Sequence, residues 1–176
     1  MRFSIVFVLA SLVVSSFAST AADVKADIVD ISAKLNALDV TVYALPLPSG
    51  TLSQALAIHT NAGPLIAASN KGAADAVSVS PNPLSLIDGR AILDSVEALE
   101  PTIYHALNGI VARFARVLPV GGISALVKQD LVSWNAASQA LEVGLIGSAP
   151  VSLVAEATTL KTRIDAAFAA AIAAFP

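Results

Sequence analysis

Few residues in this chain have the types and spacing needed to hold a metal ion. There is no cysteine, and His59 and His105 are the only histidines. A zinc site needs several His, Cys or carboxylate ligands brought together by helix or loop spacing. His59 has no histidine or aspartate three or four positions away, and His105 lies five residues after Glu100, off the face that i and i+4 residues share. The sequence predicts no metal site and leaves both histidines exposed or at the edge of the core.

Catalytic patterns are equally scarce. Serines are plentiful, but no G-x-S-x-G elbow places one of them for nucleophilic attack. Asp94 and Glu97 form a carboxylate pair at i and i+3, which is typical of a solvent-facing helix side. Gly121 and Gly122 are adjacent but belong to no phosphate-cradling motif. The sequence therefore favours a non-enzymatic protein without a cofactor.

The start of the chain has the three parts of a signal peptide. Met1 and Arg2 precede an apolar run from Phe3 to Val14, and small residues follow. This run is too short for the roughly 20 residues that span a bilayer. We expect residues 1–18 to be a signal peptide cleaved after Ala18, with Ala21 as the alternative. The expected product is a secreted protein, either extracellular or associated with the cell wall.

Composition places the remaining residues 19–176 in one domain. The chain has a formal net charge of −3, and its basic residues form no cluster, which disfavours a nucleic-acid partner. Mean hydropathy is high, at +0.76, yet no later segment has the length and lack of charge of a membrane span. The apolar residues must be distributed along amphipathic elements, and abundant alanine favours helices.

Apolar residues recur at steps of three and four through most of the chain, which predicts amphipathic helices. Proline and glycine separate these stretches, and no segment of alternating polarity is long enough to compete as a strand. The predicted helices cover residues 23–44, 51–76, 85–118, 123–145 and 150–175. Pro64 and Pro101 fall inside two of them, where proline removes a hydrogen bond, so we expect a kink or a short interruption at each. The predicted fold is an all-α, antiparallel up-and-down bundle of four to five helices, kinked near Pro64 and Pro101.

Trp134 is the only tryptophan and lies on the apolar stripe of its helix, as a core anchor or as part of a ligand cavity. If the stripes enclose a cavity, helix phase predicts the residues that line it. These candidates are Leu38, Val42, Ile103, Leu107, Ile110, Leu131, Trp134, Leu160 and Ile164.

The order and spacing of several segments resemble the fungal hydrophobic surface-binding protein A family, which includes related cell-wall galactomannoproteins. The segments are DIVDISAKLNALDVTV, ALAIHTNAGPLIAA, ALEPTIYHALNGIVARF, GGISALVKQDLVSWNAASQALE and IDAAFAAAIAAF. The resemblance implies a secreted, non-enzymatic protein that adsorbs to hydrophobic surfaces and recruits secreted hydrolases such as esterases. The related cell-wall proteins are helical bundles that hold a fatty acid between their helices.

Two hypotheses for the function follow. The first is a secreted protein that binds hydrophobic surfaces through an exposed apolar face or an opened bundle. The second is a lipid or fatty-acid carrier with an apolar cavity inside the bundle. Small alanine side chains that face a core either draw the helices together or leave a cavity, and the sequence is compatible with both.

Overall fold

The computed structural model describes residues 18–46, 50–115 and 123–175, and these residues form helices and their connections, with no strand among them. The elements are α1 (Ala21–Ala44), α2 (Leu52–Ser78), α3 (Leu86–Glu97), α4 (Glu100–Ile110), a π-helical turn (Val111–Ala115), α5 (Ile123–Ser148), a 3-10 turn (Val151–Leu153) and α6 (Val154–Ala173). The all-α prediction is confirmed. The predicted signal peptide and the predicted break at Pro119 to Gly122 lie outside the described residues, apart from Ala18.

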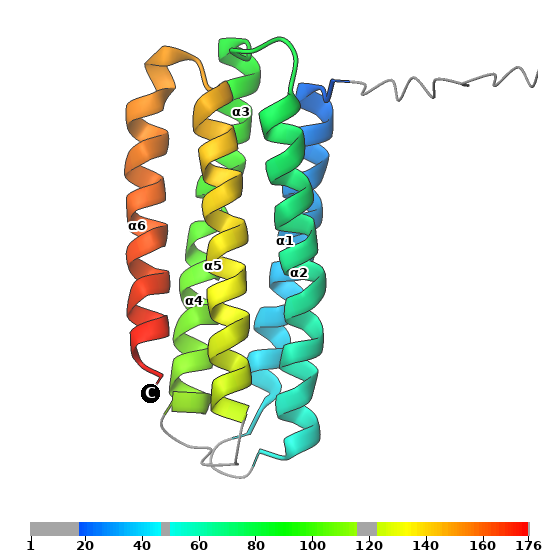
Figure 1. Cartoon of the computed structure of the whole chain (residues 1–176), viewed down its shortest axis with the longest axis vertical. Helices are drawn as coiled ribbons and strands as arrows, with labels where there is room; N and C mark the ends of the chain where they lie inside the picture. The colour runs from blue at the N-terminus through cyan, green and yellow to red at the C-terminus, as the bar shows by residue number, and fades with distance from the viewer. Residues whose placement is uncertain (1–17, 47–49, 116–122, 176) are drawn as a thin grey trace, which may run out of the picture.

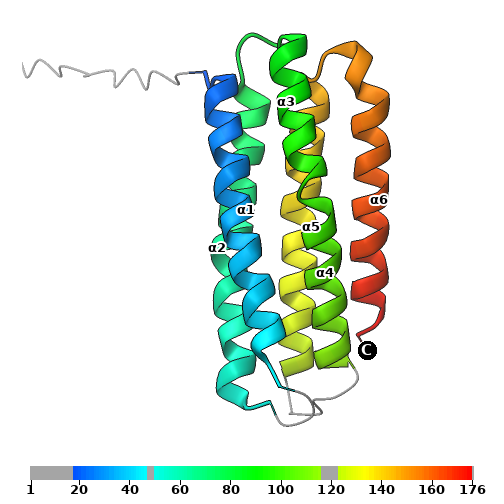
Figure 2. The same cartoon turned by 180° about the vertical axis from the view of Figure 1, so that it is seen from behind.

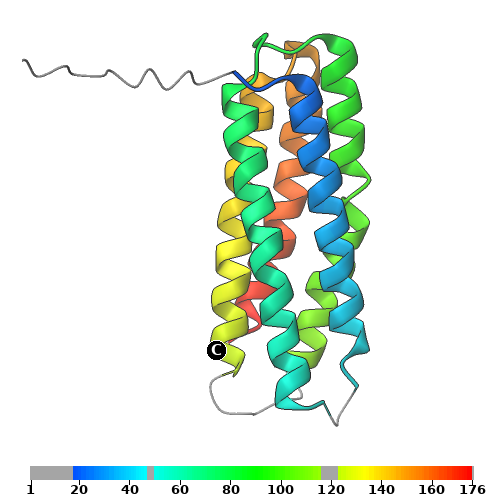
Figure 3. The same cartoon turned by 90° about the vertical axis from the view of Figure 1, so that its right-hand side faces the viewer.

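The helices stand side by side and alternate in direction along one bundle (Figure 1). Seen from behind, α3 and α4 follow one another as a single broken rod (Figure 2). Turned by 90°, the bundle shows α1 and α2 at its front, with α6 behind them (Figure 3). Contacts join α1 to α2, α2 to α5, α5 to α6, α6 to α4 and α4 back to α1. The described helices therefore close a ring around one common interior.

Side-chain caps fix where three of the helices begin. Thr20 and Asp23 form a reciprocal capping box at α1, and Thr51 and Gln54 form another at α2. At α3, the Ser85 hydroxyl oxygen accepts from the Asp88 backbone N–H at 3.1 Å. The Asp88 carboxylate accepts from the Ser85 hydroxyl at 2.7 Å. Asp88 thus bonds the hydroxyl group of the cap residue, whereas the corresponding side chains of α1 and α2 accept from the cap backbone N–H.

The two internal prolines have different surroundings. α2 continues through Pro64 without an interruption, and the kink predicted there stays a prediction. Near Pro101 the chain leaves regular helix at Ala98 and Leu99, so that α3 and α4 are separate helices. Pro101 then falls in the first turn of α4, where its missing N–H removes no helical bond.

The core follows the predicted stripes. Its largest fully buried side chains include Phe114 and Phe168, together with Leu35, Leu38 and Leu131. No helix of the described residues is long and apolar enough to span a membrane. The helices instead turn their apolar stripes inward against one another.

Candidate functional site

Within the described part of the bundle, small cavities follow one another along its axis, among them an upper, a middle and a lower cavity. The upper cavity, of about 40 Å³, lies between α3, α5 and α6 and is lined by residues such as Ile92, Leu93 and Leu153. The middle cavity, also about 40 Å³, is lined from all sides of the ring, for example by Leu35 and Leu65. The lower cavity, of about 10 Å³, lies among α1, α2, α4 and α5.

Shared walls separate these cavities. Val96, Glu142, Leu145 and Ile164 line both the upper and the middle cavity. Trp134 lines both the middle and the lower cavity. The three cavities therefore adjoin one another and form a file along the bundle, with walls that are mostly apolar.

The nine residues predicted to line a ligand are all buried in one hydrophobic cluster. Leu160 lines the upper cavity, Ile164 the upper and middle cavities, and Ile103 the middle cavity. Trp134 lines the middle and lower cavities, and the lower cavity also receives Leu38, Ile110 and Leu131. Val42 and Leu107 line none of the three, and the contact of any of the nine with a ligand stays a prediction.

Trp134 is at once a core anchor and a cavity wall. Its ring meets that of Phe168 edge to face, with the centroids 4.8 Å apart. Such aromatic pairs add about 0.5–1.5 kcal/mol beyond the area they bury. Phe168 is completely buried, so this pair holds the wall of the middle cavity in one orientation.

Two charged residues in the wall of the upper cavity were missed by the sequence analysis. Glu142 of α5 is only 8 % exposed, and its Oε2 accepts a hydrogen bond from Lys161 Nζ of α6 at 3.2 Å. Lys161 also donates to Asp165 Oδ2 at 2.5 Å. Burial raises the pKa of Glu142 to about 7, although the bond from Lys161 opposes the rise. The spacing of Ser138, Glu142 and Leu145 by four and three residues was the sequence signal for an inward-facing carboxyl group.

Both histidines lie on the outside of the bundle, as expected, but each has an aspartate partner on another helix. His59 Nδ1 lies 2.8 Å from Asp130 Oδ2, and His105 Nδ1 lies 2.7 Å from Asp39 Oδ1. The His105 ring also stacks on Tyr43 at 3.9 Å between centroids. Within the described ranges, no three His, Cys, Asp or Glu residues form a group that could hold a metal ion.

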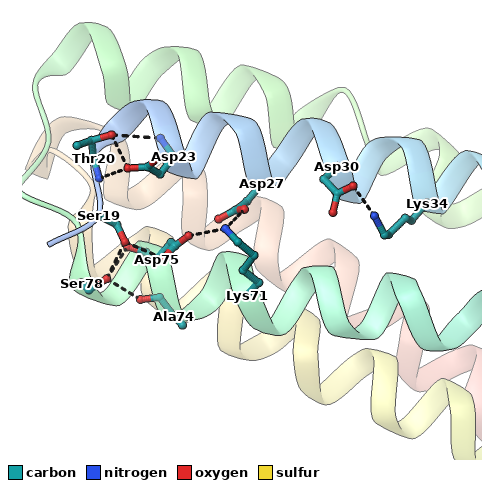
Figure 4. Close-up of polar contacts among 10 residues, drawn as sticks. All are labelled: Ser19, Thr20, Asp23, Asp27, Asp30, Lys34, Lys71, Ala74, Asp75 and Ser78. Atoms are coloured by element: carbon teal, nitrogen blue, oxygen red, sulfur yellow. Dashed lines mark hydrogen bonds and ion pairs between the residues drawn. The ribbon is translucent and has the colours of Figure 1, made fainter. Parts of the chain in front are cut away.

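A second buried carboxyl group lies between α1 and α2, away from the cavities (Figure 4). Asp27 is 6 % exposed, and its Oδ1 accepts from Lys71 Nζ at 2.5 Å. Lys71 also donates to Asp75 Oδ2 at 2.8 Å, and Asp75 Oδ1 accepts from the Ser19 hydroxyl at 2.7 Å. These bonds connect the beginning of the described chain to both helices.

Together, the ring of helices and its file of cavities define a helical bundle with a largely apolar interior. A family model described as hydrophobic surface binding protein A (HsbA) matches residues 21–147. The chain therefore belongs to the HsbA family, which confirms the resemblance seen in the sequence.

Solved structures share the fold. The crystal structure of Afmp4p in complex with palmitic acid is 29 % identical, with a TM-score of 0.79 over 89 % of this chain and 99 % of that chain. Ligand binding domain 1 of the Penicillium marneffei MP1 protein, complexed with arachidonic acids, is 20 % identical and has a TM-score of 0.78. The match covers 89 % of this chain and 99 % of that chain. Ligand binding domain 2 of the same protein, complexed with multiple arachidonic acids, is 23 % identical and has a TM-score of 0.75. The match covers 86 % of this chain and 92 % of that chain. Among curated proteins, none matches the chain.

Proposed function

We propose that this protein is a secreted, non-enzymatic carrier that binds a long-chain fatty acid between its helices. The observation that carries the proposal is the file of apolar cavities, in which the upper and middle cavities share four wall residues. The complex of Afmp4p with palmitic acid, in the same fold, supports the choice of ligand.

The lipid-bound protein must have larger cavities than the structure described above. Each of the larger cavities measures about 40 Å³, whereas pockets for small molecules measure about 300–1,000 Å³. An acyl chain would have to displace the shared wall, of which Val96 and Leu145 are only partly buried. Outward movement of α6 would enlarge both cavities, because Ile164 of α6 contributes to both.

The test is lipid extraction from the secreted protein, followed by mass spectrometry, and titration of the delipidated protein with a fatty acid. We expect a co-purified long-chain lipid or a saturable stoichiometry near one or a few acyl chains per protein. A clean extract together with no saturable binding would contradict the carrier.

A second proposed function is adsorption to hydrophobic surfaces through one end of the bundle. Leu86, Ile87 and Val151 are 58 %, 82 % and 90 % exposed. They belong to the first turn of α3 and to the turn before α6, which lie at the same end of the bundle (Figure 1). We call these three residues the apolar tip.

Retention on an alkylated resin tests the apolar tip. We expect I87D and V151D to reduce retention, because a charge cannot be buried against the resin. V29D, which places the same charge at a 69 % exposed valine on the side of α1, is the matched control. Equal retention of all three variants would contradict adsorption through the apolar tip.

In this proposal the adsorbed protein also recruits secreted esterases, which would remain on a protein-coated surface after washing.

A further inference from the structure

Glu142 and Lys161 occupy a distinctive place among the cavity walls. They are the two charged residues that line the upper cavity, and Glu142 also lines the middle cavity. The pair therefore lies where the two cavities meet. The surrounding wall is apolar, with Ile92, Val96 and Ile164 among its members.

The packing of the core does not require this pair. A buried ion pair loses hydration, and the attraction between its charges seldom compensates for this loss. Replacement of such a pair by apolar residues of similar volume often leaves the stability of a protein unchanged or increases it. Glu142 is nevertheless 8 % exposed, and the Lys161 side chain is 23 % exposed. Polar groups held in an apolar ligand pocket typically fix the orientation of the ligand.

Glu142 and Lys161 differ in whether they change protonation state near neutral pH. Lys161 is partly buried, which alone would lower its pKa, but its bonds to Asp165 and Glu142 outweigh this and raise the pKa. Lys161 therefore remains a cation at neutral pH. Glu142 lies deeper, and burial raises its pKa to about 7, so that it is the member of the pair that titrates.

We propose that Glu142 and Lys161 form the head-group site for the carboxylate of a long-chain monocarboxylic acid whose acyl chain occupies the apolar cavities. This inference rests on the proposed carrier function. The ligand carboxylate accepts from Lys161 Nζ, and protonated Glu142 donates its O–H to the same carboxylate. Both are charge-assisted hydrogen bonds, which are roughly twice as strong as neutral ones.

Ionised Glu142 would compete with the ligand for Lys161. The charged groups near Glu142 are Lys161 and Asp165, both on α6, whereas α3 contributes apolar side chains to the cavity wall. We therefore expect the affinity for the acid to fall by about tenfold between pH 6 and pH 8, which equals about 1.4 kcal/mol.

The experiment compares dodecanoic acid with dodecan-1-ol, which has the same chain and no charge. Binding to the delipidated protein is followed by calorimetry at pH 6 and pH 8. We expect K161Q to weaken binding of the acid by about tenfold while binding of the alcohol changes by less than about threefold. K161R keeps a cation and should retain the preference for the acid, and E142Q should remove the pH dependence.

Lys34 provides the matched control, because it pairs with Asp30 at i and i+4 just as Lys161 pairs with Asp165. It lines none of the three cavities, so K34Q should bind both lipids like the unmodified protein. If K161Q loses no selectivity for the acid, the head-group site is wrong and the carrier function stands. If neither lipid binds the unmodified protein, the carrier function itself fails. Thermal unfolding of each variant verifies that it is folded.

Discussion

Lys71 Nζ lies 2.5 Å from Asp27 Oδ1 and joins the C-terminal part of α2 to the buried side of α1. The same amine bonds Asp75, whose pKa falls to about 2 because of the bonds from Lys71 and Ser19. Burial raises the pKa of Asp27, and the bond from Lys71 opposes that rise. The cation is thus what allows Asp27 to stay ionised between two helices.

We expect K71M to lower the melting temperature at pH 7, because it leaves Asp27 buried without its cation. Asp75 has a lowered pKa, so its contribution to stability is present above about pH 4 and is lost as the pH falls toward about 2. In K71M, a fall in pH also protonates Asp27 and so removes the unpaired buried charge. The difference in melting temperature between K71M and the unmodified protein should therefore shrink as the pH falls from 5 to 2. A constant difference would contradict this assignment, and K34M is the control for loss of a lysine that pairs with an aspartate of its own helix.

Gly144 allows α5 to approach α2 closely. A Cβ atom at this position would lie 3.0 Å from Ala76 Cβ and 3.2 Å from the Ala73 carbonyl oxygen. We expect G144L to destabilise the protein by about 1–3 kcal/mol, the usual effect of overpacking. Urea unfolding measures this. Gly147 is on the same helix with nothing within 4 Å of such a Cβ, so G147L should be neutral or stabilising, and equal losses in both variants would disprove the close-packing explanation.

Glu142 should make stability depend on pH near neutrality. Its pKa in the folded protein is about 7, above the ordinary value of 4.5. A carboxyl group whose folded pKa is raised contributes stability that is present below about pH 4.5 and is lost as the pH rises through about 7. One pKa unit corresponds to about 1.4 kcal/mol, so the loss is at most about 3.5 kcal/mol.

The comparison with E142Q isolates this loss, because the other titrating groups are common to both proteins. Urea unfolding at pH 5 and pH 8 should show that the unmodified protein loses more stability than E142Q does. Parallel changes in the two proteins would mean that Glu142 ionises at its ordinary pKa.

Helix phase explains why the sequence predicted the fold and the buried residues. Leu35, Leu38 and Val42 share one face of α1 at steps of three and four, and all three are buried. A helix repeat fixes such a face without any knowledge of its neighbours. The closed interior then follows, because five amphipathic stripes must turn toward one another.

The positions of the charged residues in the interior depend on neighbouring helices instead. Asp27 lies near the start of α1, yet it is 6 % exposed because α2 covers it. Glu142 and Lys161 meet only through the packing of α5 on α6. A single-helix pattern contains neither the rotation nor the separation of two helices, which decide these contacts. The division of the predicted lining residues among three cavities escaped prediction for the same reason.

Ala157 of α6 lines the upper cavity and offers a way to fill it. A157L adds three carbon atoms to that wall, and we expect it to weaken fatty-acid binding by at least tenfold while changing stability by less than about 1.5 kcal/mol. Ala170 is on the exposed side of the same helix, so A170L should leave binding unchanged. Calorimetric titration and thermal unfolding provide the two measurements. Unchanged binding to A157L would place the ligand outside this cavity.

The contacts of Ser19 and Thr20 favour one of the two expected cleavage positions. Thr20 caps α1 through Asp23, and the Ser19 hydroxyl donates to Asp75 at 2.7 Å (Figure 4). The Ser19 carbonyl oxygen also accepts from Ser80 N–H at 2.8 Å. Cleavage after Ala18 would retain all of these contacts, whereas cleavage after Ala21 would remove them.

We therefore expect signal-peptide cleavage to leave a protein that begins at Ser19, which intact-mass measurement will identify. A recombinant chain that begins at Ala22 should be less stable by about 1–2 kcal/mol, because loss of an N-cap alone typically costs about 1 kcal/mol. T51A removes the corresponding cap of α2 and shows the effect of a cap without the Ser19 bonds. A secreted chain that begins at Ala22, or equal stability of the two recombinant chains, would contradict the role assigned to Ser19 and Thr20.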